Sequence, residues 1–301
     1  MHKKIAVIGA SSKTGQALLN LLGSSDFYKV FAFSLNKDLK SFFTFEEQIE
    51  LTPLQFKDFK KKIYSIEPDV IINTAGINDF AECEQNKTLC NDVNVKFVEN
   101  LARTTKILDS KIIQISSDKI FSGADGPYDE SSRPGPSTYF GKTKLAAENH
   151  IMSAVENFAI IRVSSIFGNT VFNKSDIVNN IIEKTSNGKN IHLADDYFLN
   201  PINTGDLARI ILQILGKNST GIYHAGNSDI ISMFDFGLMV AEVFDCDRTL
   251  ISSKNGDVND FKGHYGVITL KTETALGIKL PENRDSLLFH RNTKNIYKRS
   301  K

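Results

Sequence analysis

The chain has 301 residues, of which 41% are hydrophobic and 10% are aromatic. A chain of this length and composition can bury a sizeable core, which excludes a disordered protein and a small disulfide-stabilised scaffold. Lysine and arginine number 36 against 35 aspartate and glutamate residues, which gives a net charge of +1. This balance excludes a general electrostatic attraction to nucleic acid or to an anionic membrane, and leaves only local patches open.

Short apolar runs alternate with helical patterns over the first half of the chain. β-Branched runs of this length are typical of strands that are buried on both faces. Strands are predicted at 4–8, 28–34, weakly at 49–52, and within the runs 69–76, 111–117 and 158–165. Helices are predicted between them, at 14–22, before Pro68, at 91–107 and at 138–155. The alternation predicts βαβ units with right-handed crossovers, and therefore an α/β fold with a Rossmann-type, doubly wound parallel sheet.

The regular alternation of predicted strands and helices ends after residue 165, where the segments become shorter and more polar. We therefore expect a dinucleotide-binding domain over residues 1–165 and mainly a smaller, C-terminal substrate lobe over 166–301. Residues 200–224 are expected to return to the first domain. Further helices are predicted at 175–185, 204–215 and 232–244.

Cys83, Cys90 and Cys246 are an odd number of cysteines without metal-ligand spacing. They predict reduced core thiols in a cytoplasmic protein. No window approaches the run of about 18 apolar residues that a membrane span needs, and the N-terminus begins directly with a strand pattern. A signal peptide and a transmembrane helix are therefore not expected.

A glycine-containing loop joins the first predicted strand to the first helix. It consists of Gly9, Ala10, Ser11, Ser12, Lys13, Thr14 and Gly15. Glycines in such a loop let the backbone approach a pyrophosphate, whose charge lies at the helix N-terminus. Ser12 takes the place of the usual middle glycine, so an ordinary βα turn is the alternative. The strand–loop–helix context favours a dinucleotide.

The second predicted strand indicates which dinucleotide is bound. NAD sites usually carry an acidic residue near the end of this strand, to hold the ribose 2′-hydroxyl. Here no carboxylate stands there before Asp38. A 2′-phosphate would be tolerated, with Lys13, Ser34 and Lys37 as candidate partners. The sequence therefore favours NADP, with NAD as the alternative.

A series of motifs follows in order, each at the end of a predicted strand, at the start of a helix or in the second half. They are NTAG at 73–76, DVNVKFVENLA at 92–102, ISSDKIFSG at 115–123, YFGKTKLAAE at 139–148, IIRVSSIFG at 160–168, NPINTGDLA at 200–208 and LGIKLP at 276–281. Over residues 3–281 this order resembles the extended short-chain dehydrogenase/reductases, and among them the dTDP-4-dehydrorhamnose reductase branch. That resemblance implies a Rossmann domain, a smaller lobe, and hydride transfer from a nicotinamide to the C4 ketone of a nucleotide-linked sugar.

The resemblance also implies roles for individual residues. Ser117 matches the Ser/Thr that hydrogen-bonds the reacting oxygen, and Lys144 matches the lysine that holds the nicotinamide ribose. The cofactor contacts implied at the strand ends and the neighbouring helix are Asn73, Ala75, Gly76 and Asn94. The positions implied for the substrate are Asp118, Arg162, Ser165 and Asn200, and no metal is implied. A homodimer is one assembly left open.

One family residue is missing. These reductases use a tyrosine and a lysine in the pattern YxxxK, but the residue four positions before Lys144 is Phe140. Residues four apart share a helix face, whereas Tyr139 points about 100° away on a regular helix. A phenylalanine cannot donate a proton, and a positioned general acid contributes roughly 10²–10⁴ in rate.

Three explanations stay open at this point. In the first explanation, Tyr139 swings into the site from an irregular helix start. In the second, Ser117, a water or another residue donates the proton. In the third explanation the protein binds nucleotide without turnover, as a regulatory subunit like the β subunit of methionine adenosyltransferase. An epimerase or dehydratase of the same superfamily is a further alternative.

The remaining charged residues and histidines that could take part in catalysis or metal binding are given structural interpretations. Asp118 and Lys119 are interpreted as a solvent-facing pair. Because Lys119 stands where family members often carry an aromatic residue, a different pocket wall is the alternative. His192, His224 and His264 lack ligand spacing and are interpreted as structural histidines. The pair Asp195 and Asp196 is not expected to bind a metal.

Overall fold

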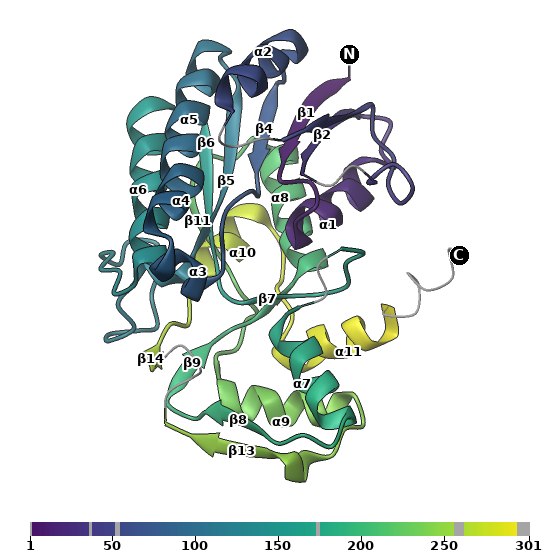
Figure 1. The fold of residues 1–301 in the computed structure, drawn as a ribbon, viewed down its shortest axis with the longest axis vertical. Helices are drawn as coiled ribbons and strands as arrows, with labels where there is room; N and C mark the ends of the chain where they lie inside the picture. Colours follow the sequence, from purple (N-terminus) through teal and green to yellow (C-terminus); the bar gives the residue numbers. More distant parts are fainter. Residues whose placement is uncertain (1, 36–37, 52–54, 173–174, 256–261, 294–301) are drawn as a thin grey trace. The chain divides into compact units, whose positions relative to one another are not determined.

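The structure is a computed structural model that describes residues 2–35, 38–51, 55–172, 175–255 and 262–293. Its main feature is a seven-stranded sheet in the order β11–β6–β5–β4–β1–β2–β3 (Figure 1). The strands are β1 (Lys3–Ile8), β2 (Tyr28–Ser34), β3 (Glu47–Glu50), β4 (Val70–Asn73), β5 (Lys111–Ser117), β6 (Phe158–Val163) and β11 (Gly221–Ala225). The pairs β1–β2, β2–β3, β1–β4 and β4–β5 are parallel, and the predicted fold class is confirmed.

Helices cover both faces of this sheet. They are α1 (Lys13–Leu22), α2 (Phe56–Ile66), α3 (Phe80–Gln85), α4 (Lys87–Asn91), α5 (Phe97–Ile107), α6 (Tyr139–Ala154) and α8 (Thr204–Lys217). A core cluster joins α2, α5 and α6 to one face, with Phe59, Leu101 and Ile151 among its members. In Figure 1, α1 lies on the opposite face. Because both faces are covered, all four residues of β4 are buried, as the apolar runs predicted.

The helix predicted over 91–107 is interrupted. A π-helical turn, η1 (Asp92–Lys96), stands between α4 and α5. Such turns insert an extra residue into a helix and are frequent at functional sites. Hydrophobic periodicity did not reveal this turn, because the apolar spacing on either side remains helical.

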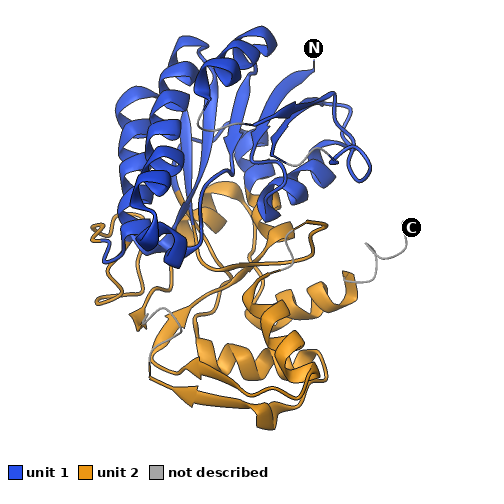
Figure 2. Ribbon diagram, viewed as in Figure 1, with its two compact units in different colours: residues 1–120, 136–162, 211–222 blue, residues 121–135, 163–210, 223–301 orange. Residues whose placement is uncertain are grey.

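The chain divides into two compact units (Figure 2). Unit 1 consists of residues 1–120, 136–162 and 211–222, and unit 2 of residues 121–135, 163–210 and 223–301. The change of unit at 162–163 lies close to the predicted boundary at 165. The segment that returns to the first unit is 211–222 rather than 200–224.

Residues 121–135 were expected in the first domain but belong to unit 2. The reason is backbone pairing with a distant part of the chain. Tyr128 donates its N–H to the Gly266 carbonyl and accepts from the Ile268 N–H, at 2.9 and 2.7 Å. A sequence pattern does not reveal this pairing, because the two segments are more than a hundred residues apart.

Unit 2 contains short strands and four further helices among its described residues. The strands are β7 (Ile166–Phe167), β8 (Ile191–Ala194), β9 (Tyr197–Leu199), β10 (Ile202–Asn203), β12 (Ile231–Ser232), β13 (Ile251–Lys254) and β14 (Gly263–His264). The helices are α7 (Ile177–Ser186), α9 (Met233–Val243), α10 (Leu270–Leu276) and α11 (Asn283–Thr293). The strands pair as β10–β7, β12–β9–β14 and β13–β8. Residues 200–210 stay in unit 2 in part because β10 pairs with β7.

The strand order of unit 1 reverses between β1 and β4. β2 and β3 lie on one side of β1, and β4, β5 and β6 lie on the other. Ligands of open parallel sheets bind beyond the carboxyl ends of the strands at such a point. Within the described ranges, none of the helices is both long and apolar enough to cross a bilayer.

Candidate functional site

The loop after β1 is tightly packed against its own helix and against the loop after β4. Gly9 has a φ of +78°, and a Cβ added there would lie 2.6 Å from the Ala75 nitrogen. A Cβ on Gly15 would collide with the Gly9 carbonyl oxygen. Ser12 caps α1, since its hydroxyl accepts the Gly15 N–H at 3.0 Å. The first and last glycines are thus required sterically, and the serine in the middle position stabilises the helix start.

Thr74 joins the two loops, a role that the sequence pattern does not indicate. Its hydroxyl lies 2.8 Å from the Ser12 hydroxyl and 2.9 Å from the carbonyl oxygens of Ile8 and Gly9. The sequence points to Thr74 only through its place inside NTAG, between the predicted cofactor contacts Asn73 and Ala75. Thr74 therefore holds the loop after β1 in place against the end of β4.

Asn73, Ala75 and Gly76 continue from β4. The Asn73 side chain is buried, donates to Gln114 Oε1 at 2.8 Å and accepts from the Ala75 N–H at 3.2 Å. A Cβ on Gly76 would lie 3.1 Å from Asn94 Oδ1 and 3.6 Å from Lys144 Nζ. The structure therefore brings Gly76, Asn94 and Lys144 together at this strand end.

Asn94 lies in the π-helical turn and is almost fully buried. Its Oδ1 accepts the Ile77 N–H at 2.8 Å, and its Nδ2 donates to the Ile77 carbonyl at 2.9 Å and to Thr143 Oγ1 at 3.2 Å. These bonds connect the loop after β4 to α6. Asn94 is thus a residue that fixes the loop and the helix against one another.

Lys144 extends from α6 to the carboxyl end of β5. Its Nζ donates to the Ile115 carbonyl at 3.2 Å and lies 5.7 Å from the centre of the Phe140 ring. Burial lowers the pKa of Lys144 to about 8, and the carboxylate of Glu148 partly opposes this effect. A buried ammonium at this edge can donate hydrogen bonds to a ribose or to a developing negative charge.

Ser117 ends β5 and is bonded to the two residues that follow it. Its hydroxyl donates to Asp118 Oδ1 at 3.0 Å and accepts the Lys119 N–H at 3.2 Å. Lys119 Nζ donates to Asp118 Oδ2 at 3.0 Å, and both charged side chains are only 4% exposed, so the interpretation of a solvent-facing pair is wrong. The turn η2 (Asp118–Ile120) thus holds a buried ion pair directly beside the candidate catalytic serine.

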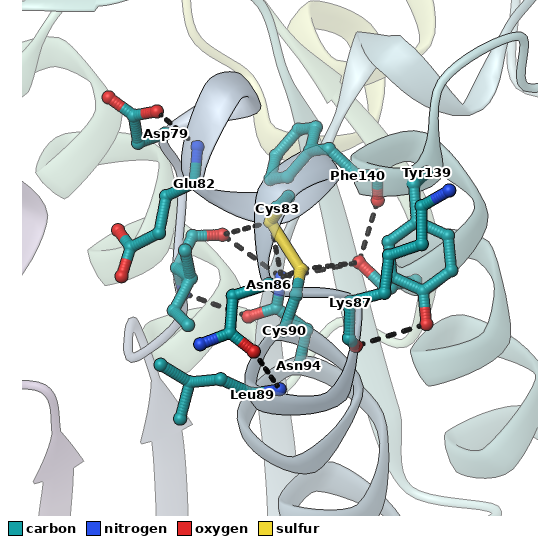
Figure 3. Close-up of a disulfide and its surroundings, with 12 residues drawn as sticks. Asp79, Glu82, Cys83, Asn86, Lys87, Leu89, Cys90, Asn94, Tyr139 and Phe140 are labelled. Carbon is teal, nitrogen blue, oxygen red and sulfur yellow. Dashed lines mark hydrogen bonds between the residues drawn. A yellow bond between two sulfur atoms is a disulfide. The ribbon is translucent and has the colours of Figure 1, made fainter.

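Phe140 and Tyr139 both lie near the Cys83–Cys90 pair but make different contacts (Figure 3). Phe140 is buried with Cys83 and Cys90, and its ring meets Phe80 edge-on at 4.8 Å. The Tyr139 hydroxyl instead donates to the Lys87 carbonyl at 3.2 Å. The helix start is regular, because Thr138 caps it by accepting the Gly141 N–H. The structure therefore places the Phe140 ring beside the Lys144 ammonium, and bonds the Tyr139 hydroxyl to the start of α4.

The prediction of reduced thiols is wrong for two of the three cysteines. Cys83 on α3 and Cys90 on α4 form a disulfide with their Cα atoms 5.2 Å apart (Figure 3). Asn86 ends α3 and caps α4, so the chain turns back there and brings the two side chains together. Asn94 Nδ2 lies 3.3 Å from Cys90 Sγ. Cys246 is free and only half-buried, so it is not a core thiol.

Arg162, selected for substrate binding, is engaged inside unit 1. Its Nη2 donates to Glu148 Oε2 at 2.9 Å, and its Nε also contacts this carboxylate. Glu148 accepts a further hydrogen bond from the Ser116 hydroxyl. These contacts tie β6 to α6 and give Arg162 a structural task, and its role toward substrate stays a prediction.

The two substrate candidates of unit 2 differ from one another. The Asn200 amide donates to the carbonyls of Asn227 at 2.8 Å and Val267 at 3.0 Å, and its oxygen accepts the Val267 N–H. It is therefore a buried organiser of this unit. Ser165 is half-buried and accepts the Ile202 N–H through its carbonyl. Their roles toward substrate stay predictions.

The histidines have separate surroundings. His192 lies 2.6 Å from the Ser252 hydroxyl, His264 stacks on Phe198, and His224 is buried edge-on to Phe121. Burial lowers the pKa of His264. In the part of the chain that the structure describes, no group of three or more His, Cys, Asp or Glu side chains is arranged to hold a metal ion.

The residues predicted to select NADP are only partly described. Ser34 is buried at the end of β2, Lys13 is half-buried at the start of α1, and Lys37 lies outside the described residues. Asp38 accepts the Ser41 hydroxyl at 2.6 Å. This carboxylate is thus occupied in a turn beyond β2.

A family model described as RmlD substrate binding domain matches residues 3–287. Three curated relatives are a probable low-salt glycan biosynthesis reductase of Haloferax volcanii, a dTDP-4-dehydrorhamnose reductase of Mycolicibacterium smegmatis and the methionine adenosyltransferase 2 subunit beta of Xenopus laevis. Their identities are 29, 31 and 28%, over 62, 56 and 62% of this chain. The chain spans only 63, 51 and 57% of the length of these relatives.

Solved structures match over a longer stretch. The dTDP-4-dehydrorhamnose reductase of Bacillus anthracis in complex with NADP has a TM-score of 0.83 and 19% identity, and covers 96% of this chain and 99% of its own. A hypothetical dTDP-4-dehydrorhamnose reductase from Sulfolobus tokodaii has a TM-score of 0.81 and 26% identity, and the match covers 92% of this chain and 96% of the other. These matches show the same two-part fold.

Proposed function

The chain belongs to the RmlD substrate binding domain family, and from this premise we propose that it is an NADPH-dependent reductase of a nucleotide-linked 4-keto sugar. The observation that carries the proposal is the group at the carboxyl ends of β4 and β5, where Gly76, Asn94, Lys144 and the Ser117 turn are assembled in unit 1. NADH is the alternative cofactor.

The residues present fit a dinucleotide. Gly9 and Gly15 leave no room for a side chain, so the loop turns tightly into the N-terminus of α1, and helix N-termini of this kind bind phosphate groups. Thr74 and Ser12 hold this loop, and Lys144 would hold the nicotinamide ribose. The absence of a carboxylate before Asp38 at the end of β2 supports NADP.

The cofactor, when bound, supplies hydride to the ketone carbon. The protein's own residues orient the reactants and handle the proton. Ser117 lies at the end of β5 to hydrogen-bond the reacting oxygen, and the Lys144 ammonium stabilises negative charge at the same edge. Asp118, Arg162, Ser165 and Asn200 remain the proposed substrate positions.

The direct test is to mix the protein with NADPH and a panel of 4-keto nucleotide sugars, and to follow the nicotinamide absorbance. We expect oxidation of NADPH that depends on one sugar nucleotide. A Lys144→Met variant is expected to lose affinity for NADPH, measured by calorimetry. Flat traces at high protein concentration, with both the unchanged protein and a Phe140→Tyr variant, contradict the proposal.

A second function is favoured by one specific observation. Phe140 replaces the family phenol, and Tyr139 is bonded to the Lys87 carbonyl. A nucleotide-binding regulatory subunit would keep the cofactor contacts without needing a proton donor. Tight binding of NADPH together with flat traces for every substrate, and turnover only in Phe140→Tyr, supports this second function.

A further inference from the structure

Ser117 has an unusual hydrogen-bond arrangement for a residue that must donate to a ketone. A hydroxyl has one hydrogen to donate and two lone pairs that accept. Here the hydrogen goes to Asp118 Oδ1, and the Lys119 N–H occupies one lone pair. One lone pair is left, which can accept a hydrogen bond from the hydroxyl of an alcohol product. The Ser117 hydroxyl therefore shares its proton with a carboxylate rather than presenting it outward.

We propose that Asp118 exchanges a proton with the substrate oxygen through Ser117, and that Lys119 holds and polarises this carboxylate. In this way the Ser117–Asp118–Lys119 turn replaces the missing phenol at Phe140. The inference rests on the proposed function, because it assigns the proton donor of that same reaction. Ser117 touches the reacting oxygen, whereas Asp118 and Lys119 act through it.

The proton balance of the step is simple. In the reduction, the ketone carbon receives hydride and the C=O π electrons move to the oxygen. This oxygen takes the Ser117 hydroxyl proton, while Ser117 Oγ takes a proton from the protonated carboxyl of Asp118. The step ends with an alcohol, an intact serine and an ionised Asp118. The hydrogen bond seen in the structure, from Ser117 to Asp118, is that of this final state, and a proton from solvent resets it.

Lys119 favours this direction. Its ammonium donates to Asp118 Oδ2 at 3.0 Å and stabilises the negative charge that Asp118 carries when the step is complete. The pair is 4% exposed on both sides, so water screens it little. The start of α6 lies directly on this turn, since a Cβ on Gly141 would collide with the Lys119 carbonyl oxygen. This contact ties the ion pair to the helix that carries Lys144.

The other proton donors considered are less suitable in this structure. Phe140 has no ionisable group, and the Tyr139 hydroxyl is bonded to the Lys87 carbonyl. The Lys144 ammonium is bonded to the Ile115 carbonyl and is needed for the ribose. Asp118 is buried and already hydrogen-bonded to the residue that faces the substrate.

The test is a mutant cycle on kcat. Asp118→Asn and Ser117→Ala are each expected to lower kcat by about 10²–10⁴. The double variant is expected to be no slower than the slower single variant, because Asp118 acts only through Ser117. Affinity for NADPH is expected to stay within about twofold in all three, a readout that separates proton transfer from damage to the fold. Additive losses in the double variant contradict the inference.

Removing one charge of a buried pair destabilises a protein by itself, so matched variants are needed. Asp118→Asn combined with Lys119→Met removes both charges, and is expected to fold but to remain as slow as Asp118→Asn. Lys119→Arg keeps the charge and is expected to retain kcat within about tenfold. Adding Phe140→Tyr to Asp118→Asn restores a separate phenol beside Lys144, and is expected to recover at least tenfold in kcat.

Three results separate this inference from the proposed function. Turnover by the unchanged protein that survives Asp118→Asn overturns the inference and leaves the function intact. No turnover by the unchanged protein, together with turnover by Phe140→Tyr alone, also overturns the inference, since a working proton route would not need the phenol. No turnover by either protein overturns the proposed function and the inference that depends on it.

Discussion

The ammonium of Lys144 lies 5.7 Å from the centre of the Phe140 ring, one helical turn earlier on α6. In this family the residue at the phenylalanine position is expected to be a tyrosine whose hydroxyl serves the reaction. Here an apolar ring fills the space and is packed against the Cys83–Cys90 disulfide. The side chain at this position therefore cannot donate a proton, and the proposed reduction requires another donor.

Tyr139→Phe is expected to leave kcat unchanged within about twofold. Its hydroxyl contributes a hydrogen bond to the Lys87 carbonyl, so the expected loss is in stability, at most about 1 kcal/mol. Steady-state kinetics and thermal melting measure the two effects. Tyr64→Phe on α2 is the matched control for removing a phenol from unit 1. A hundredfold fall in kcat in Tyr139→Phe alone would mean that this phenol enters the site.

Lys144→Met is expected to raise the free energy of unfolding at pH 7. The pKa of Lys144 is about 8 in the folded protein against an ordinary value of 10.5. Between these two pH values the unfolded chain binds more protons, so the stability of the unchanged protein rises with pH. The gain in Lys144→Met is at most about 3 kcal/mol at pH 7, and it disappears towards pH 10.5.

Urea unfolding across this pH range measures the Lys144 effect as a difference between the two proteins. Burial also lowers the pKa of Lys111, to about 8, but Lys111 is present in both proteins, so its contribution cancels. A difference that does not change between pH 7 and pH 10.5 contradicts the assignment of the lowered pKa to Lys144.

Reduction of the Cys83–Cys90 disulfide is expected to destabilise unit 1. The bond closes a loop with a sequence separation of seven, for which the chain-entropy model gives about 2 kcal/mol. Because Asn94 Nδ2 contacts Cys90 Sγ, the affinity for NADPH is also expected to fall several-fold. Melting and calorimetry with and without dithiothreitol measure both. A Cys83→Ser, Cys90→Ser variant serves as the control, and an equal response of this variant to the dithiol contradicts the prediction.

Gly15→Ala is expected to weaken NADPH binding at least tenfold and to lower the melting temperature. The added methyl group would meet the Gly9 carbonyl oxygen, so the loop after β1 must shift. Gly216→Ala on α8 is the matched control, because open space surrounds its Cβ position. That change is expected to be neutral or to stabilise the helix by up to about 1 kcal/mol. Equal affinities in the two variants contradict a cofactor role for the loop.

Much of unit 1 could be predicted from the sequence because the signals are local. The apolar runs that became β1, β4 and β5 need both faces buried. Gly9 has a backbone conformation that favours glycine, and Gly15 lies too close to the Gly9 carbonyl for a side chain. The four-residue spacing of Phe140 and Lys144 also predicted their shared helix face. These features depend on residues a few positions apart.

Other features needed the folded chain. The Cys83–Cys90 bond, the Thr74 bridge between two loops and the Arg162–Glu148 ion pair join side chains whose meeting depends on turns or on packing between elements. The Ser117 hydrogen bonds also could not be predicted, although Asp118 and Lys119 are its neighbours in the sequence. The course of the backbone through the turn decides which of their atoms meet. The sequence by itself therefore determined the type of fold and the position of the missing phenol. Tertiary structure decided which side chains form hydrogen bonds there, since hydrogen bonds depend on distances and angles that periodicity does not contain.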